Sequence, residues 1–347
     1  MSFGALALAG RTSERDRSNS GRLVWLIVSL LVLVALCFFS VALGAREVGF
    51  HDIAAAFAGQ AETIDQAAVA VRMPRTVLAL LAGMALAMAG VIMQGITRNP
   101  LADPGILGVN IGASLAVVVG VVWFGIGSAN AYMWTAILGA GISAIFVYTI
   151  GSLGRGGATP LKLTLAGAAT SVALSSLVIA VVLPRADIAG GIHQWQIGGV
   201  GGATFDNIRH AMPFLGAGFI IGLLCIRKLN ALALGEELAA GLGERVAVAR
   251  GVSALAAILL CGATTAICGP IGFLGLVVPH LCRLLVGVDH RWLLPFSAIG
   301  GACLLLFADI VGRLVARPAE IDVGIITALV GAPVFIWIVR QQKVRAL

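Results

Sequence analysis

Few residues of this 347-residue chain could carry chemistry, and most of those lie singly within long apolar runs. Asp309 and Arg313 form the clearest pair, because a spacing of four residues places both side chains on one face of a helix. A charge inside a membrane-spanning segment is costly and is a functional hypothesis by default. A purely structural ion pair is an equally good interpretation, since each charge has the other as its partner near the outer end of a predicted span.

Metal binding and nucleotide hydrolysis have no support in the sequence. His280 stands near Arg283 without a second His, Cys or carboxylate at ligand spacing, so we expect an interfacial hydrogen-bonding group and no metal site. The six cysteines form no CxxC pair and read as small buried hydrophobes. The phosphate-binding pattern GxxxxGK[ST] is absent, which predicts that any ATP hydrolysis belongs to another protein.

The composition indicates a polytopic membrane protein. Hydrophobic residues make up 59% of the chain and charged residues 11%, whereas a soluble domain carries about 25% charged residues. The 45 glycines fit closely packed membrane helices. The net charge of +7 is no sign of nucleic-acid binding, because the basic residues flank the predicted spans.

An all-α fold with about ten transmembrane helices follows from the apolar runs, since a span needs about 20 mostly apolar residues. The sixth and eighth of these runs are short, and the eighth contains Pro279 and is expected to be bent or partial. The ten predicted spans are Leu23–Leu43, Val77–Gly95, Ile106–Val122, Tyr132–Ile150, Leu161–Leu183, Met212–Ile226, Val246–Cys268, Ile271–Leu285, Leu293–Val315 and Ile321–Val339.

The basic residues predict which side of the membrane each loop occupies. With the N-terminus inside, sixteen of the 23 Lys and Arg residues lie on the inner side and seven on the outer side, as the positive-inside rule requires. We therefore expect residues 1–22 to be a cytoplasmic tail, 23–340 the transmembrane domain and 341–347 a second cytoplasmic tail. The same count places the loop 227–250 in the cytoplasm.

This loop, Arg227–Arg250, is the longest charged interval in the last two-thirds of the sequence. Good helix formers predict a short helix within Ala231–Gly241, interrupted at Gly235. A polar helix between two membrane spans must lie at the surface, where a soluble partner could contact it. The alternative is an amphipathic interfacial helix without a partner, which the acidic pair Glu236–Glu237 disfavours on anionic lipid.

Two further stretches carry information about packing and charge. Gly83 and Gly90, seven residues apart, predict a face on which a neighbouring helix packs closely. Arg72 and Arg75 flank Pro74 at the outer end of the same span. Arginines on the outer side run against the positive-inside trend and so suggest a role, although simple snorkelling is the alternative.

Several ordered motifs together resemble the FecCD-type permeases of ABC importers for iron–siderophores, haem and vitamin B12. The resemblance covers roughly Leu23 to Arg340. It rests on Arg72–Met–Pro–Arg75, Arg98–Asn–Pro–Leu–Ala–Asp–Pro104 after Gln94, Ile106–Leu–Gly108, Leu234–Gly–Glu–Glu–Leu–Ala–Ala–Gly–Leu–Gly243, Gly275–Leu–Val–Val–Pro–His280, Asp309 with Arg313, and Gly331–Ala–Pro333.

The resemblance implies the type II ABC importer permease fold in a bacterial cell membrane, with no cofactor in this chain. Its implied partners are two ATPase subunits that bind ATP and Mg, an extracytoplasmic binding protein and a second permease subunit. Residues implied to contact the ATPase are Leu232, Leu234, Gly235, Glu236, Glu237, Ala240, Gly241, Leu242 and Gly243. Residues implied to dock the binding protein are Arg72, Arg75 and Arg313, and those implied to line the pathway are Thr164, Gly167, Thr170, Ser171 and Ser175.

The implied function is ATP-driven import of a metal chelate, with an iron–siderophore as the expected substrate and haem or vitamin B12 as alternatives. A non-transporting scaffold and an ion-coupled secondary transporter are the competing classes. The latter usually needs buried ionisable residues near the midplane, and here Asp309 already has a partner. The sequence departs from the family in the outer turn, where Asp322 stands near the usual position of a proline and is expected to free the turn.

Overall fold

The structure, a computed structural model, describes residues 19–44, 48–59, 62–105, 108–153 and 160–345, and within these ranges every regular element is an α-helix. The predicted tail is described only from residue 19 onward. Ten apolar helices form a bundle: α1 (Asn19–Ala42), α3 (Ile64–Thr97), α4 (Val109–Phe124), α5 (Ala129–Ser152), α6 (Pro160–Val182), α8 (Phe205–Leu224), α11 (Val246–Cys268), α12 (Leu274–Val286), α13 (His290–Val315) and α14 (Val323–Arg345). Four short helices complete the described chain: α2 (Phe50–Phe57), α7 (Ala186–Ile197), α9 (Ile226–Ala233) and α10 (Glu236–Gly241).

Each predicted span coincides with one of the ten apolar helices. Seven of these helices are long and apolar enough to cross a membrane, and α4, α12 and the apolar part of α14, Val323–Ile338, are shorter. The short eighth span is thus confirmed as the 13-residue α12, with Pro279 inside it. The sixth predicted span, Met212–Ile226, starts too far along the chain, because α8 begins at Phe205. Thr204, the residue before α8, accepts a hydrogen bond from the backbone N–H of Asn207.

The second predicted span is much longer than the apolar run indicates. Helix α3 has 34 residues and is therefore about 51 Å long, beyond the roughly 30 Å of a bilayer core. It begins at a capping box in which Thr63 and Gln66 bond to each other's backbone N–H groups. The N-terminal part of α3 consequently carries Arg72, Pro74 and Arg75 within a continuous helix.

The predicted close-packing face on α3 is confirmed. A Cβ atom on Gly83 would overlap the carbonyl oxygen of Gly301 in α13, and one on Gly90 would overlap that of Gly275 in α12. Only glycine permits such an approach of two helix backbones. Helix α3 is therefore fixed against both α12 and α13 in the middle of the bundle.

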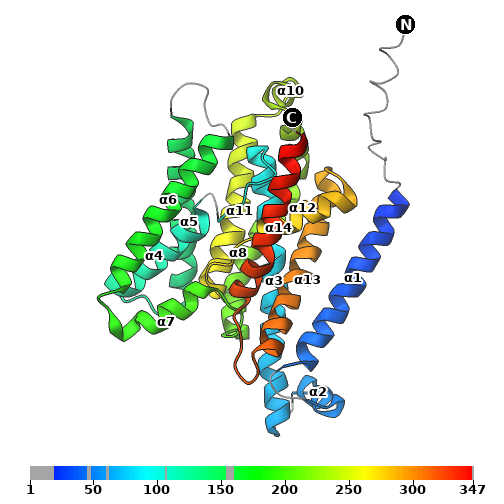
Figure 1. The fold of residues 1–347 in the computed structure, drawn as a ribbon, viewed down its shortest axis with the longest axis vertical. Helices are drawn as coiled ribbons and strands as arrows, with labels where there is room; N and C mark the ends of the chain where they lie inside the picture. The colour runs from blue at the N-terminus through cyan, green and yellow to red at the C-terminus, as the bar shows by residue number, and fades with distance from the viewer. Residues whose placement is uncertain (1–18, 45–47, 60–61, 106–107, 154–159, 346–347) are drawn as a thin grey trace.

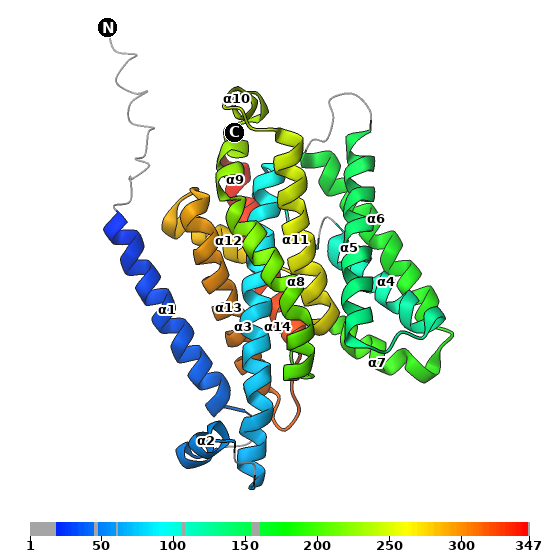
Figure 2. The same cartoon turned by 180° about the vertical axis from the view of Figure 1, so that it is seen from behind.

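The helices are arranged with α1 on one flank and α4 to α7 on the other, while α3, α8 and α11 to α14 lie between them (Figures 1 and 2). One end of the bundle, named the α10 end here, bears α10 and the end of α14. The opposite end, the α2 end, bears α2, α7 and the turn between α13 and α14. Helices α3 and α13 pack along each other, and both contact α9, the helix that precedes α10.

Candidate coupling surface and arginine cluster

The polar loop at the α10 end folds as two helices. The interruption predicted at Gly235 within Ala231–Gly241 is confirmed, because α9 ends at Ala233 and α10 begins at Glu236. Gly235 separates them with a φ of +108°, a value that favours glycine. A Cβ on Gly235 would also lie 3.3 Å from Nη1 of Arg98, so the break between the helices packs against the C-cap of α3.

Three leucines of this loop point out of the bundle. Leu234, Leu238 and Leu242 are 57%, 61% and 69% exposed. Polar residues lie beside them, since Glu236 and Glu237 are also exposed, as is Gly243. Apolar side chains clustered on a polar protrusion are typical of a protein contact site.

The predicted contact set needs two changes. Leu232 is only 2% exposed and packs inside the bundle, so it cannot meet a partner in this arrangement. Leu238, which the sequence reasoning omitted, is among the most exposed side chains of the loop. Its position four residues before Leu242 was the available signal. Ala240 and Gly241 are exposed and Gly235 is half-buried.

Two ion pairs connect different parts of the loop Arg227–Arg250. Nζ of Lys228 lies 2.6 Å from Glu244, and Nη2 of Arg250 lies 2.7 Å from Glu236. Such partly exposed pairs contribute little stability individually. They connect α9 with the turn before α11, and α10 with α11.

Asn230 of α9 joins the loop to the start of α13. Its amide donates to Asp289 at 2.8 Å, and its oxygen accepts from the backbone N–H of His290 at 3.0 Å. The oxygen also lies 2.7 Å from Nδ1 of His290. Leu229, which is fully buried, packs against Gly95 of α3. Helix α9 is therefore attached to both α3 and α13.

Asp289 is the N-cap of α13 and was missed by the sequence reasoning. Its carboxylate accepts from the backbone N–H of Arg291 at 2.9 Å. Burial alone would raise the pKa of Asp289, but the hydrogen bonds from Arg291 and Asn230 outweigh it and lower the pKa. An aspartate directly before an apolar helical run was the sequence signal.

At the α2 end, the fully buried carboxylate of Asp309 lies between two arginines. Nη2 of Arg313 is 2.7 Å from Asp309, which confirms the predicted pair. Arg75 of α3 donates to the same carboxylate through Nε at 2.9 Å and also pairs with Glu320 of the turn after α13. The contact of Arg75 with Asp309 joins α3 to α13 and had no signal in the sequence.

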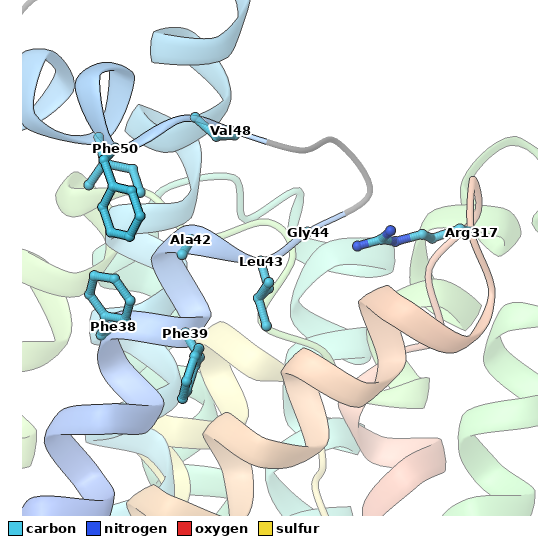
Figure 3. A pocket seen from close by; sticks show the side chains of 9 residues that line it. Phe38, Phe39, Ala42, Leu43, Gly44, Val48, Phe50 and Arg317 are labelled. Carbon is cyan, nitrogen blue, oxygen red and sulfur yellow. The ribbon is translucent and has the colours of Figure 1, made fainter.

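The guanidinium groups of Arg72 and Arg313 also donate hydrogen bonds to the end of α1, where Ala42 and Leu43 lie (Figure 3). Arg72 donates to the carbonyls of Val41 and Ala42, each at 3.1 Å. Arg313 donates to the carbonyls of Ser40 and Leu43, each at 2.9 Å. The last carbonyls of a helix lack intrahelical partners and carry the negative end of its dipole, so two arginines are suitable caps.

The arginines predicted to dock a partner are thus mostly interior. Arg72 is 7% exposed and Arg313 is 2% exposed, and the side chain of Arg75 is 11% exposed. All three have partners within the chain. A docking role would require these side chains to become accessible, and it stays a prediction.

Hydrogen bonds fix the turn before α14, whereas the sequence analysis expected Asp322 to leave this turn free. Nε2 of Gln194 in α7 donates to Asp322 at 2.5 Å. The backbone N–H of Gly324 donates to the carbonyl of Gly198 at 2.9 Å. Helix α7, which was not predicted, therefore fastens the start of α14 at the α2 end.

The residues predicted to line a pathway on α6 point partly into the chain. Gly167 and Thr170 are buried, and Thr164, Ser171 and Ser175 are half-buried, with α4 and α5 as the packing neighbours. The large exposed side chains of α6 are instead apolar and are those of Leu161, Leu165, Val172, Leu177 and Ile179. Their role in a pathway stays a prediction.

The sequence is similar to a known protein family and to several known proteins. The model of the FecCD transport family matches residues 31–341. The ferric enterobactin transport system permease protein FepD of Escherichia coli K12 is 42% identical over 315 residues, which cover 90% of this chain and 94% of FepD. The iron(3+)-hydroxamate import system permease protein FhuB of Bacillus subtilis 168 is 39% identical over 326 residues, 93% of this chain and 84% of FhuB.

A permease named for hemin transport and a solved structure are also similar to the chain. The hemin transport system permease protein HmuU of Yersinia pestis is 39% identical over 321 residues, 90% of this chain and 94% of HmuU. A solved protein assigned as a metal-chelate type ABC transporter, in an inward-facing conformation, aligns with a TM-score of 0.73 at 30% identity. The alignment covers 92% of this chain and 99% of that one.

Proposed function

The chain belongs to the FecCD transport family, and on that premise we propose that it is the transmembrane permease subunit of an ATP-driven importer of a metal chelate. The exposed leucines Leu234, Leu238 and Leu242 are the observation that supports this assignment most directly. They form an apolar contact surface on a chain that has no P-loop of its own. A separate ATPase therefore has to supply the energy.

Two ATPase subunits, which bind ATP and Mg, would dock at the α10 end, and this chain would have no catalytic activity itself. The α10 end is then cytoplasmic, with both termini inside, in agreement with the distribution of Lys and Arg residues. Loop movements would pass through Leu229 and Asn230 into α3 and α13. At the opposite end these two helices are joined by Arg75 and Asp309.

The proposed substrate is an iron–siderophore, delivered by an extracytoplasmic binding protein to the α2 end of a permease dimer. Relatives named for ferric enterobactin and for iron(3+)-hydroxamate support this class. Haem stays the main alternative because of the hemin permease among the relatives, and vitamin B12 is a further one. A chelate brings its own metal ligands, so the permease wall needs none.

The test is reconstitution of the permease with its ATPase and binding protein in proteoliposomes, followed by uptake of ferric enterobactin, ferric hydroxamate, ferric citrate and hemin. We expect ATP-dependent uptake of at least one iron–siderophore. Uptake that persists without the ATPase would indicate a secondary transporter and would refute the proposal. Exclusive uptake of hemin would refute the siderophore class and leave the importer assignment intact.

A pair of variants tests the contact surface. Leu238→Ser with Leu242→Ser should reduce copurification of the ATPase and its stimulation by the binding protein. Leu153→Ser is the matched control, because Leu153 is 66% exposed at the end of α5 and lies outside α9 and α10. Equal losses in both variants would contradict the assignment of the leucines to ATPase binding.

A further inference from the structure

Helix α3 ends in a backbone conformation that arginine rarely adopts. Arg98, the C-cap residue of α3, has a φ of 50° and a ψ of 34°, which lie in the left-handed region. Among the described residues other than glycine, only Arg98 and Phe273 have a positive φ. Glycine is the usual residue at such a helix end, because a Cβ atom crowds the backbone there. An arginine at this position is therefore conformationally unfavourable, and a contact of its side chain has to offset that cost.

The side chain of Arg98 has no directed partner in the part of the chain that the structure describes. It is exposed, and its guanidinium forms neither a hydrogen bond nor an ion pair there. Two carboxylates of the neighbouring loop, those of Glu236 and Glu244, pair with Arg250 and Lys228 instead. The negative end of the α3 dipole favours a cation at this place, but it supplies no directed bond.

The guanidinium of Arg98 lies beside the coupling surface, which consists of the exposed side chains of Leu234, Leu238 and Leu242. Its Nη1 is 3.3 Å from the position that a Cβ atom on Gly235 would occupy, and Gly235 directly follows Leu234. A side chain at this break between α9 and α10 would crowd the guanidinium, whereas glycine leaves it in place. The exposed cation and the exposed leucines therefore form one continuous surface.

We propose that Arg98 belongs to the coupling surface and binds a carboxylate of the ATPase, an inference that rests on the importer function proposed above. The matching surface of the ATPase would be an apolar groove for the leucines with an acidic residue at its edge. Guanidinium groups bind carboxylates in a bidentate manner, and arginine is enriched among the residues that dominate interface energies. Such a bond would offset the unfavourable backbone of Arg98.

The surroundings of Arg98 favour a protein carboxylate over a lipid headgroup. Anionic lipid of the inner leaflet would also attract a lone arginine. Glu236 directly follows the glycine that the guanidinium contacts, however, and both Glu236 and Glu237 are exposed. A surface of anionic headgroups would be repelled by these carboxylates, whereas a protein groove can present one carboxylate to Arg98 and complementary groups to the glutamates.

Contact with Arg98 would give the ATPase direct access to α3. The other link from the loop to α3 runs through Leu229 of α9, which packs against Gly95. Gly95 and Arg98 are three residues apart at the end of α3. A carboxylate on Arg98 would therefore move the same end of α3 without passing through α9.

The experiment measures both ATPase affinity and thermal stability of the full-length permease in detergent. We expect Arg98→Gln to raise the apparent Kd for the purified ATPase about tenfold, as is typical for loss of an arginine that dominates an interface, and Arg98→Lys to lose less. Arg98→Gly should weaken binding as Arg98→Gln does, yet its apparent Tm should equal or exceed that of the wild type, because glycine relieves the backbone. A lower Tm with unchanged affinity would show a helix cap only and would overturn the proposal.

Arg209→Gln is the matched control, since Arg209 is an exposed arginine near the start of α8, the end of that helix farther from α9. Its affinity for the ATPase should equal that of the wild type. An equal loss in Arg209→Gln would overturn the proposal, as would a loss in Arg98→Gln that occurs only when phosphatidylglycerol is present. Normal affinity in Arg98→Gln with weak binding in the Leu238→Ser, Leu242→Ser variant would refute the role of Arg98 alone. A wild-type permease that binds no ATPase would refute the proposed function as well.

Discussion

Arg75 and Asp309 lie 234 residues apart in the chain, yet their side chains form an ion pair of 2.8 Å inside the bundle. Arg75 belongs to α3 and Asp309 to α13, the two helices that meet where Gly83 packs on Gly301. Asp309 is fully buried and also pairs with Arg313. The carboxylate of Asp309 therefore joins α3 to α13. It also neutralises part of the positive charge of the arginines that cap α1.

Replacing Asp309 should destabilise the protein strongly. Asp309→Asn removes the ion-pair partner of the interior Arg313 and leaves Arg75 paired with Glu320 alone, and breaking a buried ion pair costs about 3–5 kcal/mol. We expect a large fall in the apparent Tm of the detergent-solubilised protein. Asp206→Asn is the control, because Asp206 pairs with Arg209 at the surface. Similar Tm values for both variants would contradict the structural role of Asp309.

Removing the amide of Asn230 should uncouple the loop from the bundle. Asn230→Ala abolishes the bonds to Asp289 and His290 while the exposed leucines stay in place. Basal ATPase activity of the assembled complex should persist, whereas its stimulation by the binding protein should fall about 2- to 30-fold, the range of typical coupling energies. Asn207→Ala on α8 is the control. Full stimulation in Asn230→Ala would exclude this link.

A single methyl group at the crossing of α3 and α12 should disrupt packing. Gly90→Ala would place Cβ against the backbone carbonyl of Gly275, which cannot move aside as a side chain can. Overpacking of this kind costs roughly 1–3 kcal/mol or more. Gly216→Ala on α8 meets open space and should leave the apparent Tm unchanged or slightly higher. A neutral Gly90→Ala would mean that the two helices separate readily.

Gln194 and Asp322 should show coupled effects on stability. Each single change to alanine removes the same hydrogen bond between α7 and the start of α14. The double variant should consequently lose less stability than the two single variants together, with a coupling energy of about 0.5–3 kcal/mol. A double-mutant cycle on thermal unfolding measures this coupling. Strict additivity would show that the bond contributes nothing.

The contribution of Asp289 to the stability of the folded protein should depend on pH. Its pKa in the folded protein lies below the ordinary value of 3.8, so the stability gained from its charged form is present above that value and is lost as the pH falls through the lowered pKa. Asp289→Asn should therefore have a lower Tm than the wild type at pH 7, and the difference should shrink below about pH 4. A difference that grows in acid would contradict the assigned hydrogen bonds.

The number and places of the apolar helices follow from sequence, because length and hydrophobicity of a run are local properties. The pairing of Asp309 with Arg313 was equally accessible, since both lie on one helix turn. The capping box at Thr63 and Gln66 could have extended α3 by the same local reasoning. The short helices α2 and α7 have weaker local signals and were missed.

Contacts between distant segments were decided only by the tertiary structure. Sequence spacing cannot bring Arg75 to Asp309 or Asn230 to Asp289, because such contacts depend on which helix faces pack together. The same packing turned Leu232 inward and Leu238 outward, and it gave Arg72 and Arg313 the carbonyls of α1 as partners. The sequence by itself determined the membrane class, the family resemblance and the polar loop, whereas helix packing decided which charged groups are interior and which side chains a partner can reach.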